Sequence, residues 1–133
     1  MFEENQLVAV YGSLRVNQYN YYNLGIQNQE YKGQHILPAK YEMRSFGSFP
    51  ALSKGGKNTA VVDVFEVDPE TMMQMDQLEG HTDHLKYGYH RELIDTPWGK
   101  AWCYFYNGPL SKSSPVVESG AWVKYNEELY VTQ

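Results

Sequence analysis

Short apolar runs that end at turn residues dominate the chain, and they predict strands more often than helices. The first run covers residues 7–11 and stops abruptly at Gly12. Residues 60–67 give the strongest predicted strand, because their β-branched side chains suit a pleated, half-buried surface. Residues 31–37 predict another strand, which Pro38 ends.

Further along, residues 91–96 and 100–106 predict paired strands around the turn Pro97-Trp98-Gly99. The other predicted segments are less regular: a short helix within 17–27, a continuing strand at 41–46, a break at 47–50, a turn at 54–58, a loop at 107–115 and a closing segment at 116–125.

The best-defined helix begins after Asp68, a good N-cap residue. Pro69 occupies the first helical position, and Glu70 suits the positive end of the helix dipole. Gly80 is placed to end the helix in a left-handed conformation. Its apolar residues are Met72, Met73, Met75 and Leu78, and the methionines are expected to fill the core.

Strands outnumber helices in this pattern, and most connections are too short for crossovers. We therefore expect an α+β fold, a small mixed β-barrel or curved sheet flanked by helices. No repeat or boundary divides the 133 residues, which predicts a single domain over 1–133.

Composition narrows the classes of function. The net charge of −5, without a basic run, argues against nucleic acid as a partner. No apolar stretch approaches the ~20 residues that span a bilayer, so no membrane segment is expected. The acidic N-terminus lacks signal-peptide features, and Cys103 is the only cysteine, which predicts a cytoplasmic protein without disulfides. Oligomeric state is left open.

Two features suggest chemistry. A strand that ends at Gly12 and continues with Ser13 leaves backbone N–H groups that can bind an oxyanion or a carboxylate. Glu79 lies one helical turn from Met75 and two turns from Met72, within the apolar stripe. Burial would raise the pKa of Glu79 toward neutrality, although a salt-bridged or fraying carboxylate fits the same position. Together these parts suit intramolecular acyl transfer.

The residues also resemble a known family, the gamma-glutamylcyclotransferase-like superfamily. Tyr11-Gly12-Ser13-Leu14-Arg15 is similar to its YGSL/YGTL loop, and Asn20 falls where small members carry an Asn. Further similar stretches, in the same order, are Phe49-Pro50-Ala51-Leu52, Met75-Asp76-Gln77-Leu78-Glu79-Gly80, Tyr89-His90-Arg91 and Ser119-Gly120-Ala121-Trp122.

This resemblance implies a small mixed β-barrel flanked by helices. It implies conversion of a γ-glutamyl amide or amino acid to 5-oxoproline and a free amine, without metal or cofactor. Glu79 would be the general acid/base, and the substrate would be held by Tyr11, Gly12, Ser13 and Leu14. The sequence departs from the family pattern at Asp63, at Ala121 and in the His-rich stretch 81–89, which bears on substrate identity.

Other constellations have plainer interpretations. His81, His84 and His90 with Asp83 favour a loop of solvated histidines over a metal site. Cys103 lies in an alternating strand and is expected to pack in the core. Three residues each leave two interpretations: Arg15 as a carboxylate ligand or a surface residue, and Tyr106 and Trp122 as pocket walls or core aromatics.

Three functions from different classes follow from these features. The first is a cyclotransferase acting on a small γ-glutamyl compound. The second is a non-catalytic protein that captures a small anionic or γ-glutamyl-like ligand in the same pocket. The third is an interaction domain in which Glu79 forms only an edge salt bridge.

Overall fold

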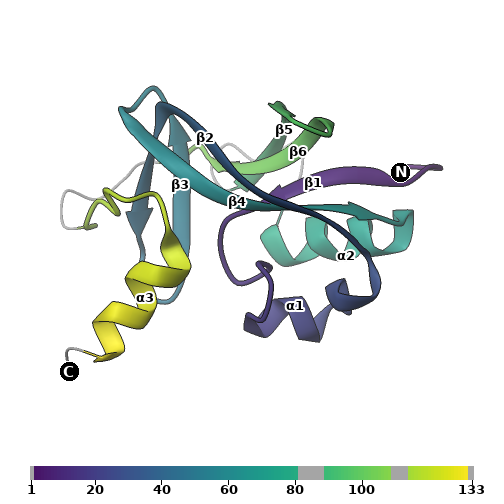
Figure 1. Ribbon diagram of the computed structural model, residues 1–133, viewed down its shortest axis with the longest axis horizontal. Helices are drawn as coiled ribbons and strands as arrows, with labels where there is room; N and C mark the ends of the chain where they lie inside the picture. Colours follow the sequence, from purple (N-terminus) through teal and green to yellow (C-terminus); the bar gives the residue numbers. More distant parts are fainter. Residues whose placement is uncertain (1, 81–88, 109–113, 132–133) are drawn as a thin grey trace.

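One mixed sheet organises the molecule (Figure 1). The computed structural model describes residues 2–80, 89–108 and 114–131. Six strands within these residues follow the spatial order β3-β2-β4-β1-β6-β5. Their bounds are β1 Gln6–Val10, β2 Glu30–Ser45, β3 Pro50–Lys54, β4 Asn58–Val67, β5 Tyr89–Thr96 and β6 Gly99–Tyr106. The helices are α1 Tyr19–Asn23, the 3-10 turn η1 Ile26–Asn28, α2 Pro69–Glu79 and α3 Trp122–Val131.

The central strand β1 pairs antiparallel with β4 and parallel with β6. The sheet curls into a half-barrel whose edge strands are β3 and β5. Side-chain contacts, rather than a strand ladder, link β3 at one end of the sheet to β5 and β6 at the other. Toward β5, the Tyr89 hydroxyl donates to the Pro50 carbonyl and Lys54 pairs with Glu92. Toward β6, the Ser53 hydroxyl donates to the Tyr106 carbonyl. The expected α+β fold with a curved mixed sheet is confirmed.

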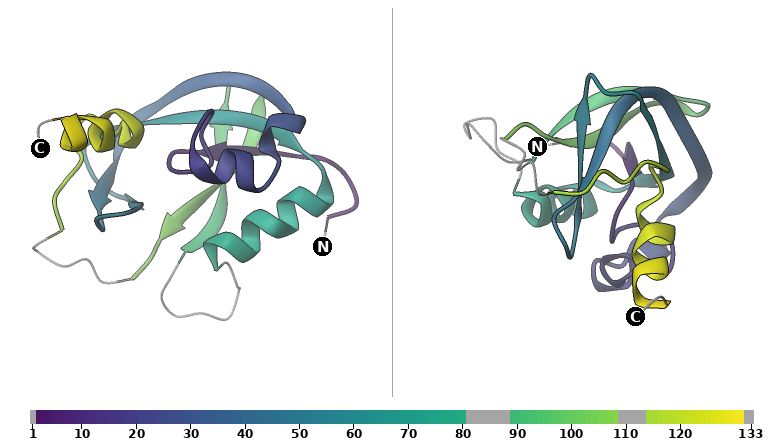
Figure 2. Two further views of the ribbon diagram at one scale, coloured as in Figure 1. Left: turned by 90° about the horizontal axis from the view of Figure 1, so that it is seen from below. Right: turned by 90° about the vertical axis from the view of Figure 1, so that its left-hand side faces the viewer.

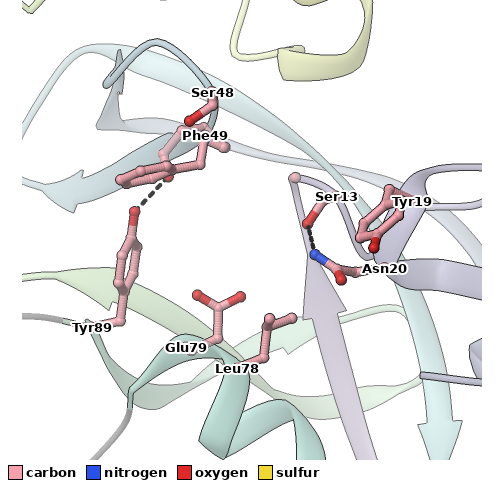
Figure 3. Close-up of a pocket in the computed structure, with 10 residues that line it drawn as sticks. Ser13, Tyr19, Asn20, Ser48, Phe49, Leu78, Glu79 and Tyr89 are labelled. Carbon is pink, nitrogen blue, oxygen red and sulfur yellow. Dashed lines mark hydrogen bonds between the residues drawn. The ribbon is translucent and has the colours of Figure 1, made fainter. Parts of the chain in front are cut away.

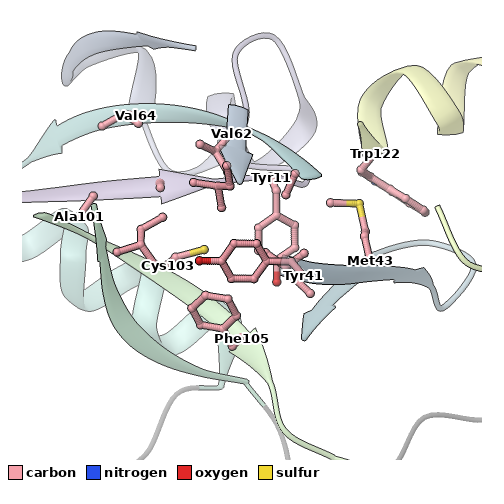
Figure 4. Packing of buried hydrophobic residues seen from close by; sticks show 14 of the residues in the cluster. Tyr11, Tyr41, Met43, Val62, Val64, Ala101, Cys103, Phe105 and Trp122 are labelled. Carbon is pink, nitrogen blue, oxygen red and sulfur yellow. The ribbon is translucent and has the colours of Figure 1, made fainter. Parts of the chain in front are cut away.

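Both faces of β1 are buried, which explains its continuous apolar sequence. Because side chains alternate along a strand, Ala9 and Tyr11 enter one core cluster, whereas Val8 and Val10 enter the other. The first cluster fills the curl of the sheet, where the Tyr41 and Phe105 rings stack (Figure 4). The second contains residues of α2, which lies with α1 on one side of the sheet, while α3 lies near the opposite end of the molecule (Figure 2).

Helix α2 matches its prediction. The Asp68 carboxylate accepts a hydrogen bond from the backbone N–H of Thr71 at 2.7 Å, and Gly80 adopts the left-handed conformation with φ 66°. Met72 and Met75 are buried as expected, but Met73 and Leu78 are exposed, so the prediction of Met73 as a core residue is wrong. None of the described helices is long and apolar enough to cross a membrane.

Three local predictions need correction. The expected helix within 17–27 is divided into α1 and η1, because Gly25 adopts φ 71° between them. The strand predicted to end at Pro38 continues through it to Ser45. The predicted break at 47–50 overlaps β3, which begins at Pro50. The predicted hairpin of 91–96 and 100–106 is confirmed, with β5 starting earlier, at Tyr89.

Candidate functional site

A cavity of about 470 Å³ lies where the loop after β1, the start of β3, the end of α2 and the start of β5 meet. Figure 3 shows the Glu79 carboxylate rising between two walls, one with Phe49 and Tyr89 and the other with Ser13 and Asn20. The lining residues are Gly12, Ser13, Tyr19, Asn20, Ser48, Phe49, Pro50, Leu78, Glu79 and Tyr89.

Glu79 is the last residue of α2, and its carboxylate is largely removed from water. Burial raises its pKa from the ordinary value of 4.5 to about 7. Within the part of the chain that the structure describes, no hydrogen bond or ion pair reaches this carboxylate. The salt-bridged interpretation of Glu79 is therefore not supported, and the carboxylate can exchange a proton near neutral pH.

Three tyrosine hydroxyls near Glu79 donate elsewhere. Tyr11 donates to the Tyr104 carbonyl at 2.6 Å, Tyr104 donates to Asp76 Oδ1 at 2.6 Å, and Tyr89 donates to the Pro50 carbonyl at 2.7 Å. The Glu79 charge in turn helps to raise the pKa of all three phenols. Because these hydroxyls have other acceptors, their proximity does not stabilise the charged form of Glu79 by hydrogen bonding.

The loop opposite Glu79 offers donors. The backbone N–H groups of Gly12, Ser13 and Leu14 have no acceptor among the described residues. The loop is held by a turn in which the Arg15 N–H donates to the Gly12 carbonyl at 3.0 Å. The Asn20 amide donates to Ser13 Oγ at 2.7 Å, which leaves the Ser13 hydroxyl hydrogen able to point elsewhere. Such a concave group of donors suits an oxyanion or a carboxylate.

The predicted site residues fall into two groups. Gly12, Ser13 and Glu79 line the large cavity. Tyr11 and Leu14 do not line it; both are buried, and they border a void of about 20 Å³ that also touches Glu79. Gly12 also has a steric role, since a Cβ there would lie 3.1 Å from Pro50 Cγ.

Arg15 is neither a cavity residue nor a surface residue. Its Nε lies 3.0 Å from Oδ2 of Asp63, and both side chains are largely buried. Asp63 also accepts from the Val16 N–H at 3.0 Å and from the Tyr31 hydroxyl at 3.1 Å. Asp63 therefore anchors the segment that follows the donor loop.

The remaining candidates are placed as follows. Trp122 belongs to the core cluster in the curl, whereas Tyr106 packs edge-on against the cavity residue Tyr89, with ring centroids 5.4 Å apart. Cys103 is fully buried, and burial raises the pKa of its thiol far above the ordinary value, as expected for a core residue.

No cluster of three or more potential metal ligands occurs among the residues that the structure describes. His90 contacts Glu92 with its Nε2 at 2.7 Å. His81, Asp83 and His84 lie outside the described residues, as does the divergent stretch 81–89 apart from Tyr89.

Sequence reasoning assigned no role to Tyr89, Phe49 or Pro50, although the motifs quoted above contain all three. It also missed Tyr19, Ser48 and the exposed Leu78 as lining residues. The family motifs could have indicated Tyr89, Phe49 and Pro50 as lining residues. Tyr19, on α1, and Ser48, in the loop before β3, are 29 positions apart in the sequence, and only the folded chain shows that both line the cavity.

Comparison with known proteins decides the family. Residues 8–124 match the family described as gamma-glutamyl cyclotransferase, AIG2-like. The chain belongs to this family. The gamma-glutamylcyclotransferase family protein YtfP of Escherichia coli K12 is 32% identical over 116 residues, 87% of this chain and 95% of the relative.

Solved structures agree with this family assignment. The solution structure of ytfP from Escherichia coli superposes with a TM-score of 0.68 at 30% identity, covering 90% of this chain and 98% of that one. The crystal structure of PH0828 from Pyrococcus horikoshii shares the fold, with a TM-score of 0.75 at 23% identity over 95% of this chain and 97% of its own. The family match over residues 8–124 extends from β1 into α3.

Proposed function

We propose that this protein is a cyclotransferase that converts a small γ-glutamyl amide or γ-glutamyl amino acid to 5-oxoproline and a free amine. The observation that carries the proposal is the position of Glu79, whose carboxylate has a pKa of about 7 and no hydrogen-bond or ion-pair partner among the described residues. Across one cavity it faces a loop whose backbone donors have no acceptor among those same residues. Family membership supports the same reaction class.

In this mechanism, Glu79 as a carboxylate takes a proton from the α-ammonium group of the substrate. The freed amine attacks the γ-carbonyl carbon, forms the new C–N bond and leaves a tetrahedral oxyanion. Glu79 then donates its proton to the departing nitrogen as the original C–N bond breaks and the oxyanion collapses to the lactam carbonyl. The ring nitrogen loses its remaining excess proton to the released amine, which departs as an ammonium ion, and Glu79 is again a carboxylate. A pKa near the working pH suits a group that must first accept and then return a proton.

The donor loop supplies the complementary charge stabilisation. The backbone N–H groups of Gly12, Ser13 and Leu14 bind the oxyanion or the glutamyl carboxylate, and the Ser13 hydroxyl adds a further donor. Ring closure also requires the γ-glutamyl chain to be held folded, so that the amine lies beside the γ-carbonyl. The cavity walls formed by Phe49 and Tyr89 restrict the chain in this way.

The test is mass spectrometry for 5-oxoproline after incubation with a panel of γ-glutamyl amino acids and γ-glutamyl amines. We expect product with the wild-type protein and a rate at least about 100-fold lower with Glu79→Gln, because an amide cannot move the proton. Circular dichroism of the variant checks that the fold is retained.

Absence of product with every substrate would contradict the proposed reaction. In that case, thermal stabilisation by a γ-glutamyl compound, equal in wild type and Glu79→Gln, would favour a ligand-capture protein. Equal turnover by the two proteins would instead exclude Glu79 as the acid/base.

A further inference from the structure

Side-chain hydrogen bonds to Asp76 connect the last turn of α2 to the sheet. Nε of Arg91, on β5, lies 3.0 Å from Oδ1 and 3.2 Å from Oδ2 of this carboxylate. The hydroxyl of Tyr104, on β6, donates to Oδ1 at 2.6 Å. One side chain of the helix therefore connects to two neighbouring strands.

The ion pair between Arg91 and Asp76 is largely buried. The Arg91 and Asp76 side chains are only 19% and 20% exposed. The Arg91 guanidinium also lies over two aromatic rings, with its Cζ 4.6 Å from the Trp102 centroid and 4.9 Å from the Phe2 centroid. A planar guanidinium can stack and pair at once, which an ammonium group cannot do as well.

Asp76 and Glu79 are three residues apart, so they lie on the same face of α2. Between them, Gln77 and Leu78 are exposed, and Gly80 ends the helix immediately afterwards. Terminal turns of helices fray when little holds them. Since Glu79 has no hydrogen bond among the described residues, the Asp76 contacts are the nearest polar links that fix its turn to the sheet.

We propose that Asp76 and Arg91 are positioning residues, which hold the last turn of α2 against β5 and β6 so that the Glu79 carboxylate stays in the cavity and faces the donor loop. Its catalytic consequence rests on the proposed function, but the placement of Glu79 can be measured without turnover.

A direct charge effect is the competing explanation, and it makes different predictions. As a nearby negative charge, Asp76 would raise the Glu79 pKa, and the positive Arg91 would lower it. Removal of Asp76 would then lower this pKa, whereas removal of Arg91 would raise it. If the pair acts by positioning, either removal lets Glu79 reach solvent and lowers its pKa.

The decisive experiment is an NMR titration of the Glu79 side-chain carboxyl carbon in uniformly ¹³C-labelled protein, with Glu79→Gln identifying the signal. We expect Asp76→Asn and Arg91→Gln both to lower the titration midpoint from about 7 by about one pH unit or more. Arg44→Gln is the matched control, since Arg44 also pairs with a carboxylate but belongs to β2 and does not line the cavity; no shift is expected.

Arg91→Lys is the milder variant, which keeps the charge but loses the planar stacking group. Positioning predicts a midpoint between those of wild type and Arg91→Gln, whereas a charge effect predicts no change. An increase in Arg91→Gln, or no shift in either Arg91 variant, would overturn the proposal.

The activity of Asp76→Asn and Arg91→Gln gives a second readout. We expect at least a tenfold decrease in kcat with little change in KM, and a shift of the acid limb of the pH profile to lower pH. If wild type forms no 5-oxoproline, the proposed function fails while the titration still decides whether the pair positions Glu79.

Discussion

At the residue scale, burial of Glu79 links the stability of the protein to pH. The pKa in the folded state is about 7, above the value of 4.5 expected in the unfolded chain. Between these values the folded state holds more protons, so its stability falls as pH rises. The contribution of protonated Glu79 is fully present below pH 4.5 and is lost as the pH rises through 7.

This linkage predicts a pH-dependent effect of Glu79→Gln. At pH 8 the variant should be more stable than wild type by roughly 3 kcal/mol, because the amide avoids burying a charge. Near pH 4.5 the two proteins should differ little. Urea unfolding of both at several pH values measures the difference, and a difference that does not change with pH would contradict this account of the carboxylate.

The sequence could single out Glu79 because helical periodicity and the family motif pointed to the same position. The burial of Tyr11 and Leu14 was harder to predict, since two core residues here flank two residues that line the cavity. Arg15 was ambiguous because its partner, Asp63, lies 48 residues away on β4. Long-range polar partners leave no periodic signal in a single sequence.

At the element scale, α2 is bounded by two caps that stabilise it comparably but lie at different distances from the site. Asp68 accepts the Thr71 N–H at the N-terminal end, and Gly80 forms the left-handed C-cap directly after Glu79. An alanine at position 80 meets no atom of the described residues within 4 Å, so the cost expected from this part of the chain is backbone strain.

We therefore expect Asp68→Ala and Gly80→Ala each to reduce the free energy of unfolding by roughly 1 kcal/mol. Only Gly80→Ala should also lower the rate of 5-oxoproline formation, because it disturbs the turn that carries Glu79. Chemical denaturation and the mass-spectrometric assay measure the two effects. Equal losses of activity in both variants would indicate that global stability, not the local turn, controls the site.

The element predictions failed where a breaking residue was accommodated by the sheet. Pro38 lies where the pairing of β2 with β4 shifts register between Leu37 and Tyr41, so its missing N–H interrupts no regular ladder. Pro50 is the first residue of an edge strand, a position that also needs no ladder donor. Helix α2 was predictable because its capping residues, its apolar stripe and its length all indicate a helix with the same bounds.

At the scale of the whole molecule, the tip of the β5–β6 hairpin reaches back to β2. Gly33 has φ 148°, and a Cβ at this position would lie 2.8 Å from Cη2 and Cζ2 of Trp98. The register of β2 against β4 shifts between Tyr31 and Gly33, so a bulge receives the indole. This contact joins the β5–β6 hairpin to β2, which is not a neighbour of either strand in the sheet.

Gly33→Ala should therefore destabilise the protein by about 2 kcal/mol or more, through both strain and collision with the indole. In the background of Trp98→Ala, Gly33→Ala should reduce the free energy of unfolding by less, because only the backbone strain at position 33 is left. Thermal unfolding of the four proteins in this double-mutant cycle gives the coupling. Additive losses would show that Trp98 does not occupy the bulge in solution.

The overall architecture was only partly predictable. Short strands and short connections indicated an α+β fold with a curved sheet, but not the parallel pairing of β1 with β6. Strand order depends on which edges meet after the sheet curls, and this is a property of the whole chain.

That parallel pairing has a consequence for how the site is made during synthesis. The donor loop and Glu79 both lie within the first 79 residues, yet the Tyr11 hydroxyl binds the carbonyl of Tyr104, 93 residues later, and Tyr104 also holds Asp76. While β6 is still in the ribosome, the nascent chain already contains the donor loop and Glu79. It does not yet contain the strand that connects the two. Contacts between such distant residues form slowly, so the site is expected to appear last, together with the complete fold.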